Sequence, residues 1–97
     1  MTKLNESYIS QKLKNLEKWQ LKEGKWIVRK YRFKEYLEGI RFVNRLAELA
    51  EKVDHHPFIT IQYKLIIVEL TSWNEKGLTD VDFALAEKYD QLFVELN

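Results

Sequence analysis

The sequence predicts an α+β fold: a four-stranded, mainly antiparallel sheet with helices packed on one face. Two pairs of strand-like segments are each joined by a short turn, as in antiparallel hairpins. Segments with apolar residues at helical spacing stand before, between and after these pairs, so the predicted order is α-β-β-α-β-β-α. With 45% apolar and 32% charged residues, the 97 residues are enough for one core, and we expect a single domain spanning 1–97.

The first half of the chain contains a helix followed by a hairpin. Residues 5–16 carry apolar side chains near helical spacing and predict a helix. Residues 19–21 predict a short strand, residues 22–25 a turn, and residues 26–33 a second strand rich in aromatic and β-branched side chains. Positions along this second strand alternate, which is typical of a sheet with one face partly wet. One set is Ile27, Tyr31 and Phe33, and the other is Val28, Lys30 and Arg32.

Residues 34–53 predict the longest helix, and its apolar side chains form two adjacent stripes. One stripe is Tyr36, Ile40, Val43, Ala47 and Ala50, and the second is Phe42, Leu46, Leu49 and Val53. Together they cover roughly 180° of the helix, wider than the ~100° that one core face needs. Either the helix lies deep in a groove of its own domain, or the second stripe is a subunit interface. The latter predicts a homodimer or homotetramer.

The second half of the chain contains another hairpin and the last helix. Residues 58–62 and 66–73 predict two strands joined by a tight turn at residues 63–65. A loop over residues 74–78 follows. Residues 79–82, Thr-Asp-Val-Asp, then open the last helix in the form of a capping box, with acidic side chains in the first turn.

The overall composition limits the classes of function. A formal charge of +1 offers no strong field to recruit nucleic acid or an acidic membrane. The absence of cysteine excludes disulfides and thiolate metal sites. No apolar run has the length of a signal peptide or a membrane span. We therefore expect a soluble, cytoplasmic protein that binds neither nucleic acid nor a membrane.

The only two histidines are adjacent, in the sequence Asp54-His55-His56-Pro57. Imidazole is the side chain whose ordinary pKa lies near neutrality, so this pair is the natural candidate for proton transfer. Pro57 pushes His56 toward an extended conformation, which helps to hold the rings in a set orientation. One imidazole could protonate a leaving hydroxyl while the other takes a proton from a neighbouring nitrogen, as a dehydration requires.

Other interpretations of these residues stay open. The histidines could be satisfied surface or core residues, and Trp73 could be either a flat apolar pocket wall or part of the core. Asp82 could serve only the capping box. Adjacent histidines point in different directions from an extended backbone, and no third histidine or cysteine exists, so we expect no metal site. No serine lies in a nucleophile-elbow pattern and no glycine-rich loop could hold a phosphate.

A wider set of residues at fixed spacing surrounds the histidines. Glu51 precedes them; after Pro57 come five residues and Tyr63, then nine and Trp73, then eight and Asp82. This set resembles the signature of the pterin-4a-carbinolamine dehydratases. The resemblance extends over most of the chain, through Leu16 with Trp19, Phe33-Lys34-Glu35-Tyr36, and Gly77-Leu78-Thr79.

The resemblance implies a fold, an activity and a set of site residues. The fold is the same α+β layer, and the activity is the removal of water from a 4a-hydroxytetrahydropterin to give a quinonoid dihydropterin, a hydro-lyase reaction. This reaction recycles the tetrahydrobiopterin-type cofactor that aromatic amino-acid hydroxylases oxidise. The pterin is the substrate, and no metal or organic cofactor is expected. The catalytic residues are His55 and His56, the further substrate-binding residues Asp54, Thr71, Ser72, Trp73 and Asn74, and the supporting residues Glu51, Pro57, Tyr63 and Asp82.

Two positions depart from the animal enzymes of this family. Those enzymes carry a third active-site histidine where this chain has Trp73, and a glutamate where it has Asn74. Tryptophan cannot exchange a proton near neutral pH, so loss of one proton-transfer step could cost on the order of 10²-fold in rate. Two rivals to an active enzyme follow: a module that binds a pterin but turns it over poorly, and an interaction protein. The second rests on animal family members that bind a homeodomain transcription factor through their helical oligomer interface.

Overall fold

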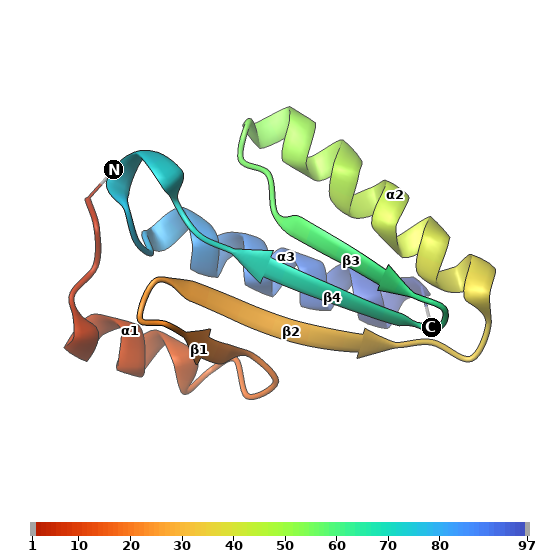
Figure 1. Ribbon diagram of the computed structural model, residues 1–97, viewed down its shortest axis with the longest axis horizontal. Coiled ribbons are helices and arrows are strands. Elements are labelled where there is room, and N and C mark those ends of the chain that lie inside the picture. The colour runs from red at the N-terminus through yellow and green to blue at the C-terminus, as the bar shows by residue number, and fades with distance from the viewer. Residues whose placement is uncertain (1, 97) are drawn as a thin grey trace.

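The computed structural model, which describes residues 2–96, confirms the predicted fold class and order of elements (Figure 1). A short 3-10 turn, η1, is added before the last helix. The elements are α1 (Glu6–Leu13), β1 (Gln20–Lys22), β2 (Trp26–Arg32), α2 (Tyr36–Val53), β3 (Phe58–Gln62), β4 (Leu65–Leu70), η1 (Trp73–Glu75) and α3 (Asp80–Leu96).

The sheet has the strand order β1-β2-β4-β3, and every neighbouring pair is antiparallel. The central strands β2 and β4 are neighbours in the sheet, although α2 and β3 stand between them in the chain. After β2, α2 carries the chain past the position of β4, and β3 then forms the edge strand on the far side of β4. In register, Arg29 and Ile59 both stand opposite Val68 and therefore share one face of the sheet. The start of β3 and the end of β4 lie side by side at one end of the sheet, where Phe58 pairs with Glu69.

The core lies between one face of the sheet and the helices. In Figure 1 α3 runs behind the sheet, and α2 runs beside it above β3. The two helices contact each other, and α2 also contacts β4. Burial of apolar side chains between these layers is the main contribution to the stability of the fold. The buried side chains include Ile27, Tyr31, Ile66, Val68 and Leu70 from the sheet, Phe42, Leu46 and Ala50 from α2, and Phe83, Ala86 and Tyr89 from α3.

The fourth strand is shorter than predicted, because the chain leaves the sheet after Leu70. The backbone N–H of Ser72 donates to the carbonyl of Gly77 at 3.0 Å, which closes a small loop around η1. Lys76 turns this loop in the left-handed region, with φ of 57°. The loop directs residues 71–75 away from the ladder and across the end of the sheet.

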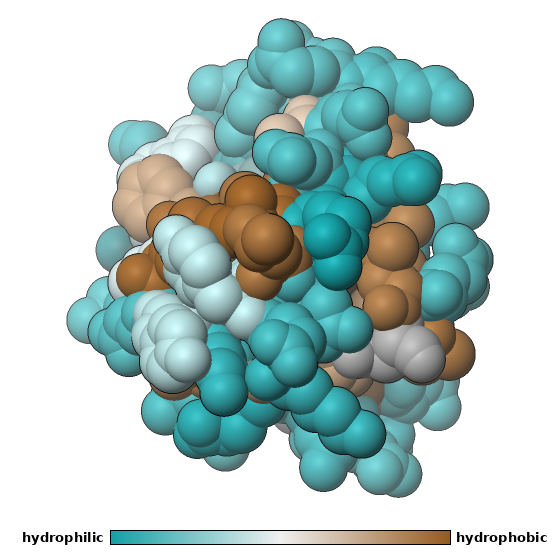
Figure 2. Space-filling view, turned by 90° about the vertical axis from the view of Figure 1, so that its right-hand side faces the viewer, coloured by the Kyte–Doolittle hydropathy of each residue, from teal (hydrophilic) through white to brown (hydrophobic). Residues whose placement is uncertain are grey.

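The assignment of the second stripe of α2 as a subunit interface is wrong. Phe42 and Leu46 are fully buried in the protein's own core. Of the stripe, Val53 at the end of α2 is exposed, and the other exposed large apolar side chains of α2 are near its start, at Tyr36 and at Leu37, which is 61% exposed. This end of the molecule faces the viewer in Figure 2, where apolar side chains gather in a patch.

No helix within residues 2–96 is long and apolar enough to cross a membrane.

Candidate active site

The histidine pair lies where α2 ends and the chain crosses to β3. Asp54 takes the left-handed conformation, φ 53° and ψ 47°, and its N–H donates to the carbonyl of Ala50. The N–H of His55 donates to the same carbonyl at 3.1 Å. A left-handed residue is a common way to end a helix, and aspartate tolerates this conformation better than most side chains. The abrupt end sends His55 and His56 across the end of the sheet.

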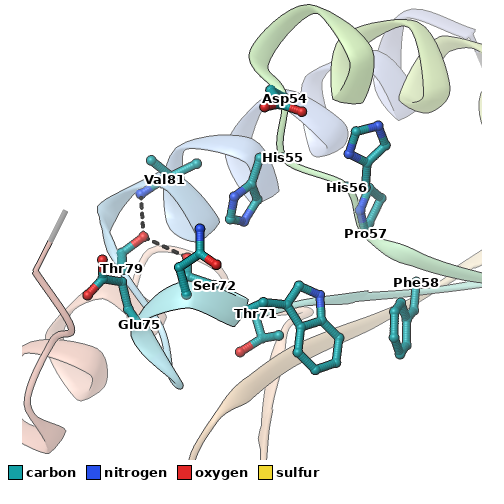
Figure 3. Close-up of a pocket in the computed structure, with 12 residues that line it drawn as sticks. Asp54, His55, His56, Pro57, Phe58, Thr71, Ser72, Glu75, Thr79 and Val81 are labelled. Atoms are coloured by element: carbon teal, nitrogen blue, oxygen red, sulfur yellow. Dashed lines mark hydrogen bonds between the residues drawn. The ribbon is translucent and has the colours of Figure 1, made fainter.

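A pocket of about 470 Å³ lies at this end of the sheet (Figure 3). The helix-to-strand crossing, residues 54–58, forms one side, and the loop after β4, residues 71–75, forms another. Thr79 and Val81, at the start of α3, complete the lining. The structure thus brings together two segments that are separated by residues 59–70 in the sequence. Seven residues expected to bind substrate line this pocket: Asp54, His55, His56, Thr71, Ser72, Trp73 and Asn74.

His55 is paired with a buried carboxylate. Its Nε2 lies 2.8 Å from Oδ1 of Asp82; the His55 side chain is 18% exposed and that of Asp82 is fully buried. The other carboxylate oxygen, Oδ2, accepts the Ser72 hydroxyl at 2.7 Å and the Thr79 N–H at 2.9 Å. Both oxygens of the buried carboxylate are therefore satisfied, as burial of a charged group requires.

Asp82 also completes the predicted capping box of α3. The Thr79 hydroxyl accepts the N–H of Val81 at 3.3 Å, and Oδ2 of Asp82 accepts the N–H of Thr79. The reciprocal bonds satisfy backbone donors at the start of the helix. Asp82 thus has two partners of different kinds: a helix terminus and an imidazole. The interpretation of Asp82 as a cap alone is incomplete.

His56 stands at the rim of the pocket. Its Nε2 lies 2.6 Å from Oε2 of Glu51, in the last turn of α2. Both side chains are open to solvent, His56 by 53% and Glu51 by 79%. In Figure 3 His55 lies toward Ser72 and Thr79, whereas His56 stands above Pro57. The two neighbouring imidazoles therefore meet very different surroundings.

Trp73 belongs to an aromatic cluster at the pocket and not to the core, since it is 58% exposed. Its indole lies 5.1 Å from that of Trp26 and 5.3 Å from the ring of Phe58, measured between centroids. Trp26 and Phe58 are themselves 5.0 Å apart. Sequence analysis missed Phe58 as a lining residue, although it directly follows the histidine motif. It also missed Trp26, whose place beside Trp73 depends on strand pairing.

Two of the predicted site residues, Thr71 and Tyr63, make contacts outside the histidine pair. The Thr71 hydroxyl lines the pocket, but it donates to the carbonyl of Lys25 at 2.6 Å and so ties the end of β4 to the start of β2. Tyr63 lies in the turn between β3 and β4, at the opposite end of β3 from the pocket. It is 68% exposed, and its ring lies 6.1 Å from that of Tyr36. The structure therefore does not bring Tyr63 to the histidines.

The residues of the pocket offer proton-transfer groups, a flat apolar surface and short polar side chains. Within residues 2–96 no three His, Cys, Asp or Glu side chains are grouped so as to hold a metal ion. That the site works without a metal or organic cofactor stays a prediction.

The chain is similar over most of its length to a known protein family. The family model described as "Pterin 4 alpha carbinolamine dehydratase" matches residues 2–92. A protein of Metallosphaera sedula with the name "Putative pterin-4-alpha-carbinolamine dehydratase" is 38% identical over 92 residues, 95% of each chain. A protein of the same name from Picosynechococcus is 43% identical over 91 residues, 94% of this chain and 98% of the other.

Solved structures give the same picture. A transcriptional coactivator/pterin dehydratase from Brucella melitensis superposes with a TM-score of 0.89 at 33% identity, covering 94% of this chain and 98% of that chain. A pterin dehydratase-like protein that is a RuBisCO assembly factor in the alpha-carboxysome superposes with a TM-score of 0.68 at 22% identity, covering 77% and 88%. This second likeness extends to the fold alone.

Proposed function

The chain belongs to the pterin-4a-carbinolamine dehydratase family, and on this basis we propose that it removes water from a 4a-hydroxytetrahydropterin. The single observation that supports this activity best is the joint placement of His55 and His56 on one pocket. The product is a quinonoid dihydropterin. The reaction takes place in the cytoplasm and returns to the tetrahydropterin pool a cofactor that aromatic amino-acid hydroxylases have oxidised.

The proposed reaction is an elimination that needs one acid and one base. The bond between C4a and the hydroxyl oxygen breaks, and the proton on N5 leaves, so that a double bond forms between C4a and N5. The departing oxygen takes up a proton and leaves as water. Groups held in reach of both atoms typically contribute about 10²–10⁴-fold each to such proton transfers. Two imidazoles with different partners suit these two roles, and no metal or organic cofactor is needed.

The pterin ring is flat and has polar edges, which fits the chemistry of the pocket walls. We place its face on the aromatic cluster of Trp73, Phe58 and Trp26, where stacking adds attraction beyond simple area burial. Asp54 and Asn74 then offer polar groups to its edges. A direct test is the rate at which the purified protein dehydrates a freshly generated 4a-hydroxytetrahydropterin. No acceleration over the solution reaction by a folded protein would contradict the proposed activity.

A second candidate is a module that binds a pterin with little turnover. It is favoured by the indole of Trp73, which is a hydrogen-bond donor only and cannot act as a third acid or base. Binding and turnover separate the two candidates. Tight binding of a pterin product analogue without dehydration supports the module, whereas turnover supports the enzyme.

We further propose that the protein associates as a homodimer or homotetramer through the exposed patch at the start of α2. Tyr36 and Leu37 of α2 are exposed, as is Tyr63 after the edge strand β3, whose ring lies 6.1 Å from that of Tyr36. Exposed apolar groups that lie together commonly mark an interaction surface. A different protein partner on the same surface is the rival, and co-purification of a stoichiometric second protein would favour it.

A further inference from the structure

The buried carboxylate of Asp82 determines which atom donates in each hydrogen bond of the network that it forms with His55, Ser72 and Thr79. An ionised carboxylate only accepts hydrogen bonds, so the nitrogen that faces Asp82 must carry a proton. That nitrogen is Nε2 of His55, at 2.8 Å. The Ser72 hydroxyl has one proton and gives it to Oδ2 of Asp82. The bond of 2.9 Å between the Ser72 and Thr79 hydroxyls must then have Thr79 as its donor.

The resulting network is directed toward Asp82 and is anchored in the backbone. The N–H of Val81 donates to the Thr79 hydroxyl, and Thr79 donates to Ser72 (Figure 3). Ser72 in turn donates to Asp82. The backbone N–H of Thr79 donates to the same oxygen of Asp82. Because these donors hold Oδ2, the carboxylate cannot turn away from His55 without leaving a buried donor unsatisfied.

The other ring nitrogen of His55 is available to a ligand. Nδ1 has no hydrogen bond from any residue in the described part of the chain. It is also absent from the unpartnered buried polar atoms there, which are Arg29 Nε and Tyr89 Oη. Nδ1 is therefore accessible, on a ring that lines the pocket. In neutral His55 this nitrogen carries a lone pair.

We propose that Asp82 is a positioning residue that holds His55 in the Nε2-protonated tautomer, so that Nδ1 serves as the base of the dehydration. This inference rests on the proposed function. Nδ1 takes the proton from N5 of the pterin while the double bond to C4a forms and the bond from C4a to oxygen breaks. The carboxylate of Asp82 stabilises the imidazolium that results, as in other carboxylate–imidazole pairs.

His56 is then the acid. It gives its proton to the departing oxygen, which leaves as water. Its solvent-exposed pairing with Glu51 lets it regain a proton from water. His55 loses its extra proton to water in the same cycle, so the protein returns to its starting state. The roles of the two histidines differ because only His55 has a buried partner, Asp82, that fixes its ring.

The tautomer can be observed without any variant. Nitrogen-15 NMR of the wild-type protein, at a pH where His55 is neutral, distinguishes a protonated ring nitrogen from an unprotonated one. We expect Nε2 to be protonated and Nδ1 to be unprotonated. A neutral His55 with its proton on Nδ1 overturns the proposal. Because this measurement needs only the wild-type protein, it holds even if a variant fails to fold.

Asp82→Asn tests the consequence for catalysis. The amide oxygen can keep the bonds from Thr79 and Ser72, which turns the amide NH₂ toward Nε2 of His55. Nε2 must then accept, and the proton moves to Nδ1. We expect kcat to fall by at least about 10²-fold with KM little changed; the same carboxylate-to-amide change in a Ser-His-Asp triad costs about 10⁴-fold.

Asp80→Asn is the matched control, since it removes the same charge from the same helix end. Asp80 is exposed, faces Lys12 at 3.5 Å and is not among the residues that line the pocket. We expect its kcat to stay near wild type. Equal losses in both variants, or a wild-type kcat in Asp82→Asn with a reversed tautomer, overturn the proposal. If the wild-type protein shows no dehydration, the proposed function and the base role both fail, while the spectrum still decides the tautomer.

Discussion

The indole of Trp73 stands edge-on to the indole of Trp26, with centroids 5.1 Å apart and ring planes at 85°. The arrangement holds a mostly exposed ring at the pocket, where a flat ligand can stack on it. Trp73→Ala should therefore weaken the affinity for a pterin by roughly tenfold, equivalent to ~1.4 kcal/mol. The free energy of unfolding should change much less than the ~3–5 kcal/mol of a buried tryptophan. Calorimetric titration and thermal unfolding of one sample measure both.

The control for this prediction is Tyr8→Ala, which removes an exposed aromatic ring from α1, away from the pocket. Its pterin affinity should equal that of the wild type. A large loss of stability in Trp73→Ala with unchanged affinity of the folded protein would contradict the stacking role. Trp73→His is the informative converse, because it restores an imidazole at this position; we expect higher turnover and looser binding.

The two histidines should respond differently to removal. His55→Ala and His56→Ala should each lower kcat by roughly 10²-fold or more, the size expected for loss of a positioned proton carrier. His55→Ala should in addition destabilise the fold by about 1–3 kcal/mol, because it deprives the buried Asp82 of a donor. His56→Ala should change stability by no more than ~0.5 kcal/mol, since its partner Glu51 is exposed.

Urea unfolding and steady-state kinetics on the same two variants measure these effects. Unchanged turnover in both variants would remove the histidines from the mechanism. Equal stability losses would instead show that the Asp82 partnership contributes nothing to the fold. Glu51→Gln, which keeps the shape at the rim, completes the series and should have a far smaller effect than Asp82→Asn.

The hairpins and the crossing from α2 to β3 could be predicted because their signals are local. Gly24 lies in the turn between β1 and β2, and Phe58–Gln62 was bounded correctly by Pro57 and the turn at Tyr63. Thr71 to Trp73 has strand-like composition, yet pairing of Ser72 with Gly77 takes it out of the sheet. Propensity describes the residue types, whereas the loop-closing bond depends on a partner five residues away.

The sequence could not predict which residues of the site contact one another, because these contacts join residues that are far apart in the chain. The spacing of the motif indicates that Glu51, His55 and Asp82 matter, but only the fold brings Asp82 to His55 across 27 positions. For α2 the periodicity predicts a wide apolar arc without indicating which edge faces the sheet, so it does not distinguish a buried Phe42 from one at a subunit interface. Tyr63 shares the spacing of the motif and still lies far from the pocket.

Association should depend on the exposed end of α2. Leu37→Asp adds a charge to the apolar patch and should shift the protein toward monomer, with little change in its own stability. Phe42→Asp places the charge in the core and should unfold the chain. Sedimentation equilibrium of the wild type and Leu37→Asp tests the first expectation. A wild-type protein that is monomeric at micromolar concentration would rule out this interface.

Alkaline pH should weaken the fold through two buried phenols. Burial raises the pKa of Tyr89 well above its ordinary 10.0, and the negative charge of Asp82 adds to the shift. Burial also raises the pKa of Tyr31, whose hydroxyl donates to Asp90 at 2.5 Å. A group whose pKa is raised by folding keeps its full contribution below the ordinary value and loses it as the pH climbs toward the raised one. Stability should therefore fall above pH ~10, by about 1.4 kcal/mol per pH unit for each tyrosine.

Tyr89→Phe isolates one of these contributions. Oη of Tyr89 has no hydrogen-bond partner among residues 2–96, so its removal should cost little near pH 7. Above pH ~10 the variant should lose stability more slowly than the wild type, by about 1.4 kcal/mol less per pH unit. Tyr31→Phe should show the same gentler slope but a real loss near pH 7, because Asp90 loses a donor. Urea titrations from pH 7 to pH ~11, compared between wild type and each variant, cancel the lysines that titrate in the same range. Identical slopes in the wild type and Tyr89→Phe would show that this phenol does not resist ionisation in the folded state.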